Sequence, residues 1–251
     1  DGVIVLGGGS LDGVTLGSAT RQSFTTSGTI DIFNSLNVAS GVTLNMGTSN
    51  WRMRTTGAQD IKTVSGNATI NIAGGTITAG FGVAQTLSIG SGVTLQGFGT
   101  LTQSSAATVN NAGTILANTA SQIFNISPGT FANAGTLSLG AGTMTISSAS
   151  WSNTGAFNVG PSTVLNITGN VLAGGLGTFN RTGGSVNVSG TITNTGNTLD
   201  IGTNGDFGTG GLTSLSGTIV GGTLVSDGVI VLGGGSLDGV TLGSATRQSF
   251  T

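Results

Sequence analysis

Apolar and polar residues alternate along much of the chain with a period of two, which is typical of β-strands that bury one face. The alternating segments are short and rich in Val, Ile, Thr and Leu, and Gly, Asn or Ser-Gly separates them. They include residues 29–32, 42–46, 69–72, 86–89, 144–146 and 186–188. No window combines a 3.6-residue apolar period with helix-forming residues. The sequence therefore predicts an all-β fold with essentially no helix.

A longer period of about 20 residues is marked by glycines that precede a small polar residue and an apolar one. In the second half of the chain these are Gly113, Gly135, Gly155, Gly177, Gly196, Gly217 and Gly239. Continued through Gly28, Gly47, Gly66 and Gly92, the series gives about eleven turns per 226 residues. A turn of this length cannot bury its apolar face or satisfy its backbone alone. The period therefore predicts a single-stranded parallel β-helix (β-solenoid), in which eleven turns at strand spacing would rise ~53 Å.

Asparagines stand two residues before several of these glycines. They are Asn111, Asn133, Asn153 and Asn194. In a solenoid such positions lie above one another at a corner, where side-chain amides can hydrogen-bond from turn to turn. Alternatively, Asn is present because it tolerates a left-handed backbone at the corner. The pattern predicts a stacked corner and leaves both explanations open.

The first 25 residues of the chain recur without a change as the last 25, so that residues 1–25 equal residues 227–251 at an offset of 226. Identity at every position, including surface positions, indicates recent duplication of a whole unit. We therefore interpret residues 1–226 as one full tandem repeat of a continuous solenoid and residues 227–251 as the start of the next identical repeat.

Composition limits the classes of partner. Disorder is the simple alternative for a Gly/Ser/Thr-rich chain, but disordered chains combine low hydrophobicity with high net charge, and this chain has 36% hydrophobic residues and a net charge of -2. Only 6 residues are Lys or Arg, too few for the basic surface that nucleic acids require. No run of 18 apolar residues is present to span a bilayer. Without cysteine there are no disulfides or thiolate metal sites.

Groups for catalysis or metal binding are sparse. The aspartates of the repeat are scattered and the chain has no Glu or His, so proton transfer lacks its usual groups and we expect no enzyme activity. They include Asp12, Asp31, Asp60, Asp200 and Asp206. The segment from Gly202 to Gly208 has a faint similarity to calcium-binding glycine- and aspartate-rich nonapeptides. One copy does not supply six to eight oxygen ligands, so we expect no metal and no cofactor.

Arg52 and Arg54 are the closest pair of basic residues, and in a strand they share one face while Trp51 and Met53 share the other. If Trp51 and Met53 point inward, the arginines form a small basic spot that could contact an anionic glycan or a neighbouring fibre. A solvated pair is the simpler interpretation.

Aromatic residues at alternating strand positions are expected in the core. The residues assigned to the interior are Phe24, Phe33, Phe124, Phe131, Phe157, Phe179 and Phe207. Trp151 lies between polar residues and could stack on a sugar, although core packing is the preferred interpretation.

Short motifs carry a resemblance to a known group. They are N-A-G-T-I at 111–115, N-A-G-T-L at 133–137, S-G-T-I at 216–219 and L-D-G-V-T-L at 237–242. In style and period the whole chain resembles the repetitive passengers of giant bacterial surface proteins such as filamentous haemagglutinins and autotransporter adhesins. The resemblance implies a right-handed parallel β-helix, secretion across the bacterial envelope, and a role in adhesion or as a surface filament. Identical units of this length depart from that group and suggest a long, regular fibre.

We therefore expect a structural role: a fibre- or stalk-forming segment of a giant extracellular protein at the bacterial cell surface. Its partners would be neighbouring repeats of the same chain, with laterally associated fibres or surface glycans as further contacts.

The second hypothesis is a module that binds glycan, or less readily ice, through a flat face of Thr, Ser and Asn. That hypothesis requires a regular threonine array, and T-x-T occurs only sporadically, for example at 76–78, 143–145 and 191–193. A pectinase-like enzyme ranks third.

Overall fold

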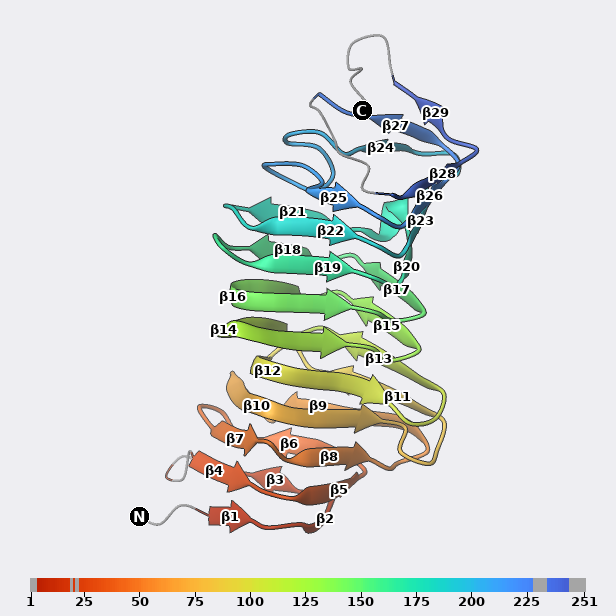
Figure 1. Ribbon diagram of the computed structural model, residues 1–251. Coiled ribbons are helices and arrows are strands. Elements are labelled where there is room, and N and C mark those ends of the chain that lie inside the picture. Colours follow the sequence, from red (N-terminus) through yellow and green to blue (C-terminus); the bar gives the residue numbers. More distant parts are fainter. Residues whose placement is uncertain (1–3, 19, 21–22, 228–233, 244–251) are drawn as a thin grey trace.

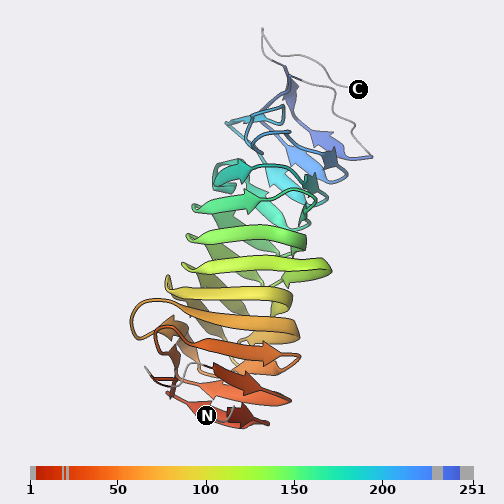
Figure 2. The same ribbon diagram turned by 90° about the vertical axis from the view of Figure 1, so that its left-hand side faces the viewer.

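The computed structural model describes residues 4–18, 20, 23–227 and 234–243, and in it the chain winds into a parallel β-solenoid of about ten turns (Figure 1). Strands of successive turns pair in parallel. Figure 2 shows the same stack from the side, elongated along one axis. Within the described ranges, the only helix is the short 3-10 helix η1 (Ala173–Gly175). The predicted all-β solenoid is confirmed.

Each complete turn passes through three faces, which we call the first, second and third in chain order. The first face holds β1 (Ile4–Leu6), β4 (Ser23–Thr26), β7 (Thr43–Gly47), β18 (Ala156–Val159), β21 (Thr178–Arg181), β24 (Thr198–Asp200), β27 (Thr223–Val225) and β29 (Thr241–Leu242). The second face holds β2 (Gly9–Asp12), β5 (Thr29–Phe33), β8 (Asn50–Met53), β19 (Val164–Ile167), β22 (Ser185–Val188) and β25 (Ser214–Leu215). Four long strands run through both: β10 (Ala68–Ala79), β12 (Val93–Gln103), β14 (Thr114–Ile126) and β16 (Thr136–Ile146).

The third face is an 11-stranded parallel sheet. Its strands are β3 (Thr15–Leu16), β6 (Leu36–Val38), β9 (Gly57–Thr63), β11 (Gln85–Ile89), β13 (Ala107–Asn111), β15 (Thr130–Asn133), β17 (Ser150–Asn153), β20 (Asn170–Leu172), β23 (Thr191–Thr193), β26 (Thr218–Val220) and β28 (Ser236–Asp238).

The core consists of apolar columns that run along the axis, because alternate residues of each strand point inward and pairing is in register. The inner column of the second face contains Ile30, Trp51, Ile77, Leu101, Ile126, Ile146, Ile167, Val188 and Leu215, all buried. Burying each such side chain contributes roughly 1.5–3 kcal/mol. Since each residue packs on those one turn above and below, stability depends on the neighbouring turns.

Two phenylalanines depart from the predicted interior. Phe33 lies on the outward side of β5 and is half-buried, because the inward positions of that strand are Ile30 and Ile32. Phe179 is partly buried and packs against the core. The other five assigned phenylalanines are buried as predicted.

The solenoid has about ten turns rather than the predicted eleven per 226 residues. Leu44 pairs with Ile70, and Ile70 with Leu95, so these two turns take 26 and 25 residues. The glycine series overcounted here because it treated different corners as equivalent. Gly47 is the last residue of the first-face strand β7, whereas Gly66 precedes the first-face part of β10. At strand spacing the corrected rise is ~50 Å per repeat.

The duplicated segment occupies different faces in its two copies. Ser10–Asp12 lies in β2 on the second face, whereas the identical Ser236–Asp238 forms β28 and pairs with β26 on the third face. Likewise Thr15–Leu16 lies on the third face, and its copy Thr241–Leu242 pairs with β27 in the position of the first face. The 226-residue offset thus advances the chain by ten turns and one further face. Residues 228–233 and 244–251 of the second copy lie outside the described residues.

Candidate functional site

The corner between the third and first faces is where four of the marker glycines stack: Gly113, Gly135, Gly155 and Gly177. A Cβ added to Gly135 would lie 2.0 Å from the carbonyl oxygen of Gly113, and one added to Gly155 would lie 1.9 Å from that of Gly135. Real Cβ atoms do not approach backbone this closely. Glycine is therefore required at this corner by the close approach of successive turns.

The other three marker glycines in the second half of the chain do not belong to this column. Gly217 stacks on Gly190 at the corner between the second and third faces, where an added Cβ would lie 2.0 Å from the Gly190 carbonyl oxygen. Gly196 and Gly239 have positive φ of 77° and 62° and open space around them. The predicted series therefore combines glycines of two close-packed corners with two left-handed glycines that have open space around them.

Asn111, Asn133 and Asn153 form a buried ladder inside the third face. Asn111 Nδ2 donates to Asn133 Oδ1 at 2.6 Å, and Asn133 Nδ2 donates to Asn153 Oδ1 at 2.7 Å. Asn133 Nδ2 also donates to the carbonyl oxygen of Gly135 at 3.1 Å. None of these asparagines has positive φ. Of the two explanations that the sequence left open, the structure contains the hydrogen-bonded ladder.

Asn194 stands apart from this ladder because one turn interrupts it. Ala173, one residue beyond the paired Leu172 and Thr193, occupies the position below Asn194, and the chain there enters η1. Asn153 Nδ2 instead donates to the carbonyl oxygen of Leu176 at 3.0 Å. The Oδ1 of Asn194 is left buried without a hydrogen-bond partner. An interrupted amide ladder predicts such an unpaired acceptor, because Ala173 below Asn194 has no side-chain amide to donate.

Trp51 and Met53 of β8 are fully buried, so Arg52 of the same strand and Arg54, which directly follows it, lie on the outward side. The two pairs lie on opposite faces, as the alternation predicts. Arg52 binds Asp31 through two hydrogen bonds of 2.5 and 2.8 Å, and Arg54 lies 3.8 Å from the same carboxylate. The Arg52 guanidinium also stacks on Phe81 at 4.6 Å from the ring centroid. A single carboxylate thus faces two guanidinium groups, so the spot is only partly neutralised, and Phe81 covers the Arg52 guanidinium.

The segment from Gly202 to Gly208 packs against the first face through Phe207. Phe207 is buried and its ring lies 5.5 Å from that of Phe179. Arg181 donates to the carbonyl oxygen of Gly211, three residues beyond this segment, and to that of Gly184 near its own strand, and burial lowers the pKa of its guanidinium. Among the described residues, no group of three His, Cys, Asp or Glu side chains could hold a metal ion.

Outward positions form hydroxyl and amide columns that are not visible along the sequence. On the first face Thr43, Thr69, Thr94, Thr114 and Thr136 stack in successive turns. A second column carries amides, with Asn71 donating to Asn45 at 2.8 Å and Gln96 donating to Asn71 at 2.7 Å. The second face has a similar column, made of Thr29, Asn50, Thr76, Thr100, Asn125, Thr145, Asn166, Asn187 and Ser214. Threonines that no T-x-T motif connects along the chain are thus aligned across turns in one column of the first face, while the column of the second face mixes Thr, Asn and Ser.

Ionisable residues are absent from the middle of the solenoid. From residue 63 to residue 180 the sequence has no Asp, Glu, Lys, Arg or His. This stretch covers β10 to β20 and most of the columns. Its outer surface therefore offers hydroxyl, amide and methyl groups and no charge.

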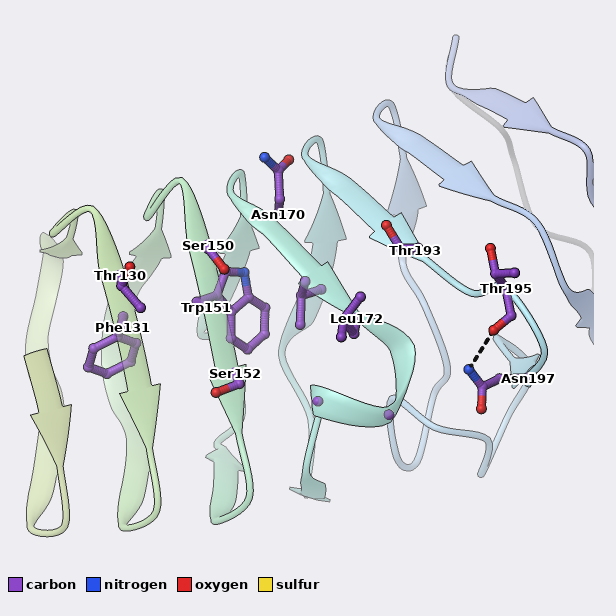
Figure 3. A pocket seen from close by; sticks show the side chains of 13 residues that line it. Thr130, Phe131, Ser150, Trp151, Ser152, Asn170, Leu172, Thr193, Thr195 and Asn197 are labelled. Carbon is purple, nitrogen blue, oxygen red and sulfur yellow. Dashed lines mark hydrogen bonds between the residues drawn. The ribbon is translucent and has the colours of Figure 1, made fainter. Parts of the chain in front are cut away.

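The third face carries a pocket of ≈ 610 Å³ within and just beyond this uncharged stretch (Figure 3). Its wall is formed by β15, β17, β20 and β23 together with η1. Between β17 and β20 only Trp151 and Val171 pair, so the sheet is opened at this point. The polar lining residues include Thr130, Ser150, Ser152, Asn170, Thr193 and Asn197.

Two large side chains of this pocket, Leu172 and Trp151, differ strongly in exposure. Leu172 is 66% exposed, one of the few large apolar side chains on the described surface. Trp151 is 3% exposed, which confirms the core interpretation, and Figure 3 shows its indole beside β17 on the side facing β20. Its Nε1 is buried and has no hydrogen-bond partner. The pocket therefore combines an apolar rim, a hydroxyl and amide lining and an aromatic ring behind the wall.

Two further pockets adjoin this one on the outer side of the same sheet. One, lined in part by Thr86 and Thr108, shares Thr130 with it. The other, lined in part by Ser88 and Asn110, shares Ser152. The pocket that shares Thr130 continues the first one along the side where the strands begin, so the two form a groove along the axis from β9 to β23, while the pocket that shares Ser152 lies toward the opposite ends of the strands. None of the residues that line the three pockets is ionisable. We call this groove the uncharged groove.

Comparison of the chain with protein-family models, with curated proteins and with solved structures finds no significant match. The described residues contain no helix that is long and apolar enough to cross a bilayer.

Proposed function

We propose that this chain is a fibre- or stalk-forming segment of a giant extracellular protein of the bacterial cell surface, acting in adhesion, cell-cell contact or surface filament formation. The observation that supports this role is the continuous inner column and parallel ladder that join each turn to the next, combined with the unchanged 25-residue duplication. A chain built this way becomes longer with each added repeat and keeps the same width. Cooperative contacts between neighbouring turns give it stiffness.

Electron microscopy of a chain of several repeats tests the proposal. We expect unbranched filaments of constant width that lengthen by ~50 Å for each added repeat, the rise of about ten turns at strand spacing. Compact particles, or a length that does not scale with the number of repeats, would refute the fibre role.

A second candidate function, glycan binding through a Thr/Ser/Asn face, is favoured by one observation. The outward hydroxyls and amides form regular columns over many turns on a surface without ionisable groups. Such a face suits a neutral, hydroxyl-rich partner. Binding of fibres to immobilised neutral polysaccharide, and its absence on unmodified resin, tests this candidate.

A further inference from the structure

We propose that the pocket at β15 to β23 is the main subsite of a binding site for a linear, neutral glycan that lies along the uncharged groove. This inference names the site and ligand class of the second candidate function and does not depend on the fibre role. A chain could build filaments with this pocket empty, and the pocket could bind sugar in a single repeat.

The charge distribution selects the ligand class. The lining of the pocket and of the two adjoining pockets contains no ionisable side chain. An acidic glycan would lose hydration on entering the groove and would find no cation to compensate for it. A neutral sugar loses only hydroxyl hydration, which the side chains of Ser150, Asn170 and Thr193 can replace with hydrogen bonds.

The shape and apolar content also suit a sugar ring. A volume of ≈ 610 Å³ lies within the usual range of small-molecule sites and exceeds what one sugar ring needs. Leu172 presents an apolar side chain at the rim, where the C–H face of a pyranose can cover it. Covering an isolated exposed leucine removes apolar surface from water, which favours binding. The hydroxyl and amide lining then orients the ring.

The groove explains why a polymer is favoured over a single sugar. It runs past seven strands of the third face, β9 to β23, and therefore extends over ~29 Å at strand spacing. Thr86, Thr108, Thr130 and Ser150 are paired in successive turns along it, so equivalent hydroxyls recur at every turn. A linear chain of sugars can contact several of them at once.

The experiment uses the two tryptophans as a matched pair of reporters. Trp51→Phe leaves Trp151, in the pocket wall, as the sole indole, whereas Trp151→Phe leaves Trp51, which is buried against Thr26 several turns away. The probes are an array of neutral oligosaccharides of glucose, mannose, galactose, xylose and N-acetylglucosamine, with oligogalacturonate as the acidic comparison. The strongest neutral oligosaccharide on the array is then titrated by fluorescence and by calorimetry.

Leu172→Asp is the test variant, and Val64→Asp is its control. The two side chains are 66% and 65% exposed, and Val64 lies outside all three pockets. Both variants should therefore fold. We expect Leu172→Asp to weaken neutral glycan binding about tenfold or more, because a carboxylate in the groove must lose its hydration when the ligand binds. Val64→Asp should leave affinity unchanged.

The expected result is saturable binding of a neutral oligosaccharide that changes the fluorescence of Trp151 but not that of Trp51. The proposal is overturned if no neutral oligosaccharide binds, if oligogalacturonate binds more tightly, or if Leu172→Asp and Val64→Asp behave alike. Filament length in electron microscopy should be the same for both variants, so failure of the glycan proposal is separable from failure of the fibre role.

Discussion

The asparagine ladder provides the sharpest test of how the turns are held together, and the substitution is Asn133→Asp. Asn133 is 2% exposed, accepts from Asn111 and donates to Asn153 and to the carbonyl oxygen of Gly135. A carboxylate can still accept from Asn111, but it has no hydrogen to donate. Two donated bonds are therefore lost, and a negative charge is placed among acceptors in a buried site.

The expected loss follows from these contacts. Each lost hydrogen bond costs about 1 kcal/mol, and the poorly compensated buried charge adds a penalty of similar or larger size, so we expect the free energy of unfolding to fall by roughly 3–5 kcal/mol at neutral pH. Burial raises the pKa of such a carboxyl above that of an unfolded aspartate, near 3.9. Stability is then greatest below pH ~4 and is lost as pH rises through the folded-state pKa, by about 1.4 kcal/mol for each unit of that increase.

The assay is guanidinium denaturation followed by circular dichroism at several pH values between 4 and 8, with the unchanged chain as reference. Asn158→Asp is the matched control. Asn158 lies on the outward side of β18 and accepts from Asn180 Nδ2 at 3.0 Å, so a carboxylate there keeps its hydrogen bond and its contact with water. We expect it to cost less than about 1 kcal/mol. Equal destabilisation by the two variants, or an Asn133→Asp chain whose deficit does not grow with pH, would refute the ladder as a source of stability.

Three further predictions concern the corner, the segment of residues 202–211 and the repeat. Gly135→Ala should destabilise the chain by about 3 kcal/mol or more because its Cβ meets the Gly113 carbonyl oxygen at 2.0 Å, whereas Gly174→Ala, with no atom within 4 Å, should be nearly neutral; thermal denaturation distinguishes them. Arg181→Met should free residues 202–211, since it removes the hydrogen bonds to Gly183, Gly184, Gly211 and Thr213, and limited proteolysis should show faster cleavage there without global unfolding. In a two-repeat chain, the copy-to-copy offset of ten turns and one face should rotate the second repeat by about a third of a turn about the axis, and cryo-electron microscopy that finds the two repeats in the same orientation would contradict it.

Much of the fold could be predicted from the sequence because both periods have direct physical causes. Alternation of period two follows from side chains that point to opposite sides of a strand, and it placed Trp51 and Met53 on one face and Arg52 and Arg54 on the other. The spacing of Asn111, Asn133 and Asn153 identified residues that contact one another. The predicted glycine column was wrong where similar short motifs occupy different corners of the solenoid. Gly217 has the same sequence context as Gly135 but packs against Gly190.

The candidate site could not be predicted, because it depends on neighbours across turns rather than along the chain. T-x-T motifs are sparse, but Thr43, Thr69 and Thr94 become adjacent through pairing between turns of unequal length. The uncharged groove likewise requires knowing that Thr130 and Ser152 belong to the same face. One available signal was overlooked: the absence of any ionisable residue from 63 to 180 is visible in the sequence itself.

The two placements of the duplicated segment show why such a repeat need not equal a whole number of turns. A strand in this solenoid contacts the strands above and below it, and Ser236–Asp238 pairs with β26 on the third face just as Gly9–Asp12 pairs with β5 on the second. The requirement on each strand is an inward apolar residue in register, which Leu11 and Leu237 both supply. If this offset persists through a tandem array, the uncharged groove faces a different direction in each successive repeat. After three repeats it faces the first direction again. A fibre of this kind would present the groove on all sides, so the proposed glycan site could contact a polysaccharide layer without the fibre being oriented toward it.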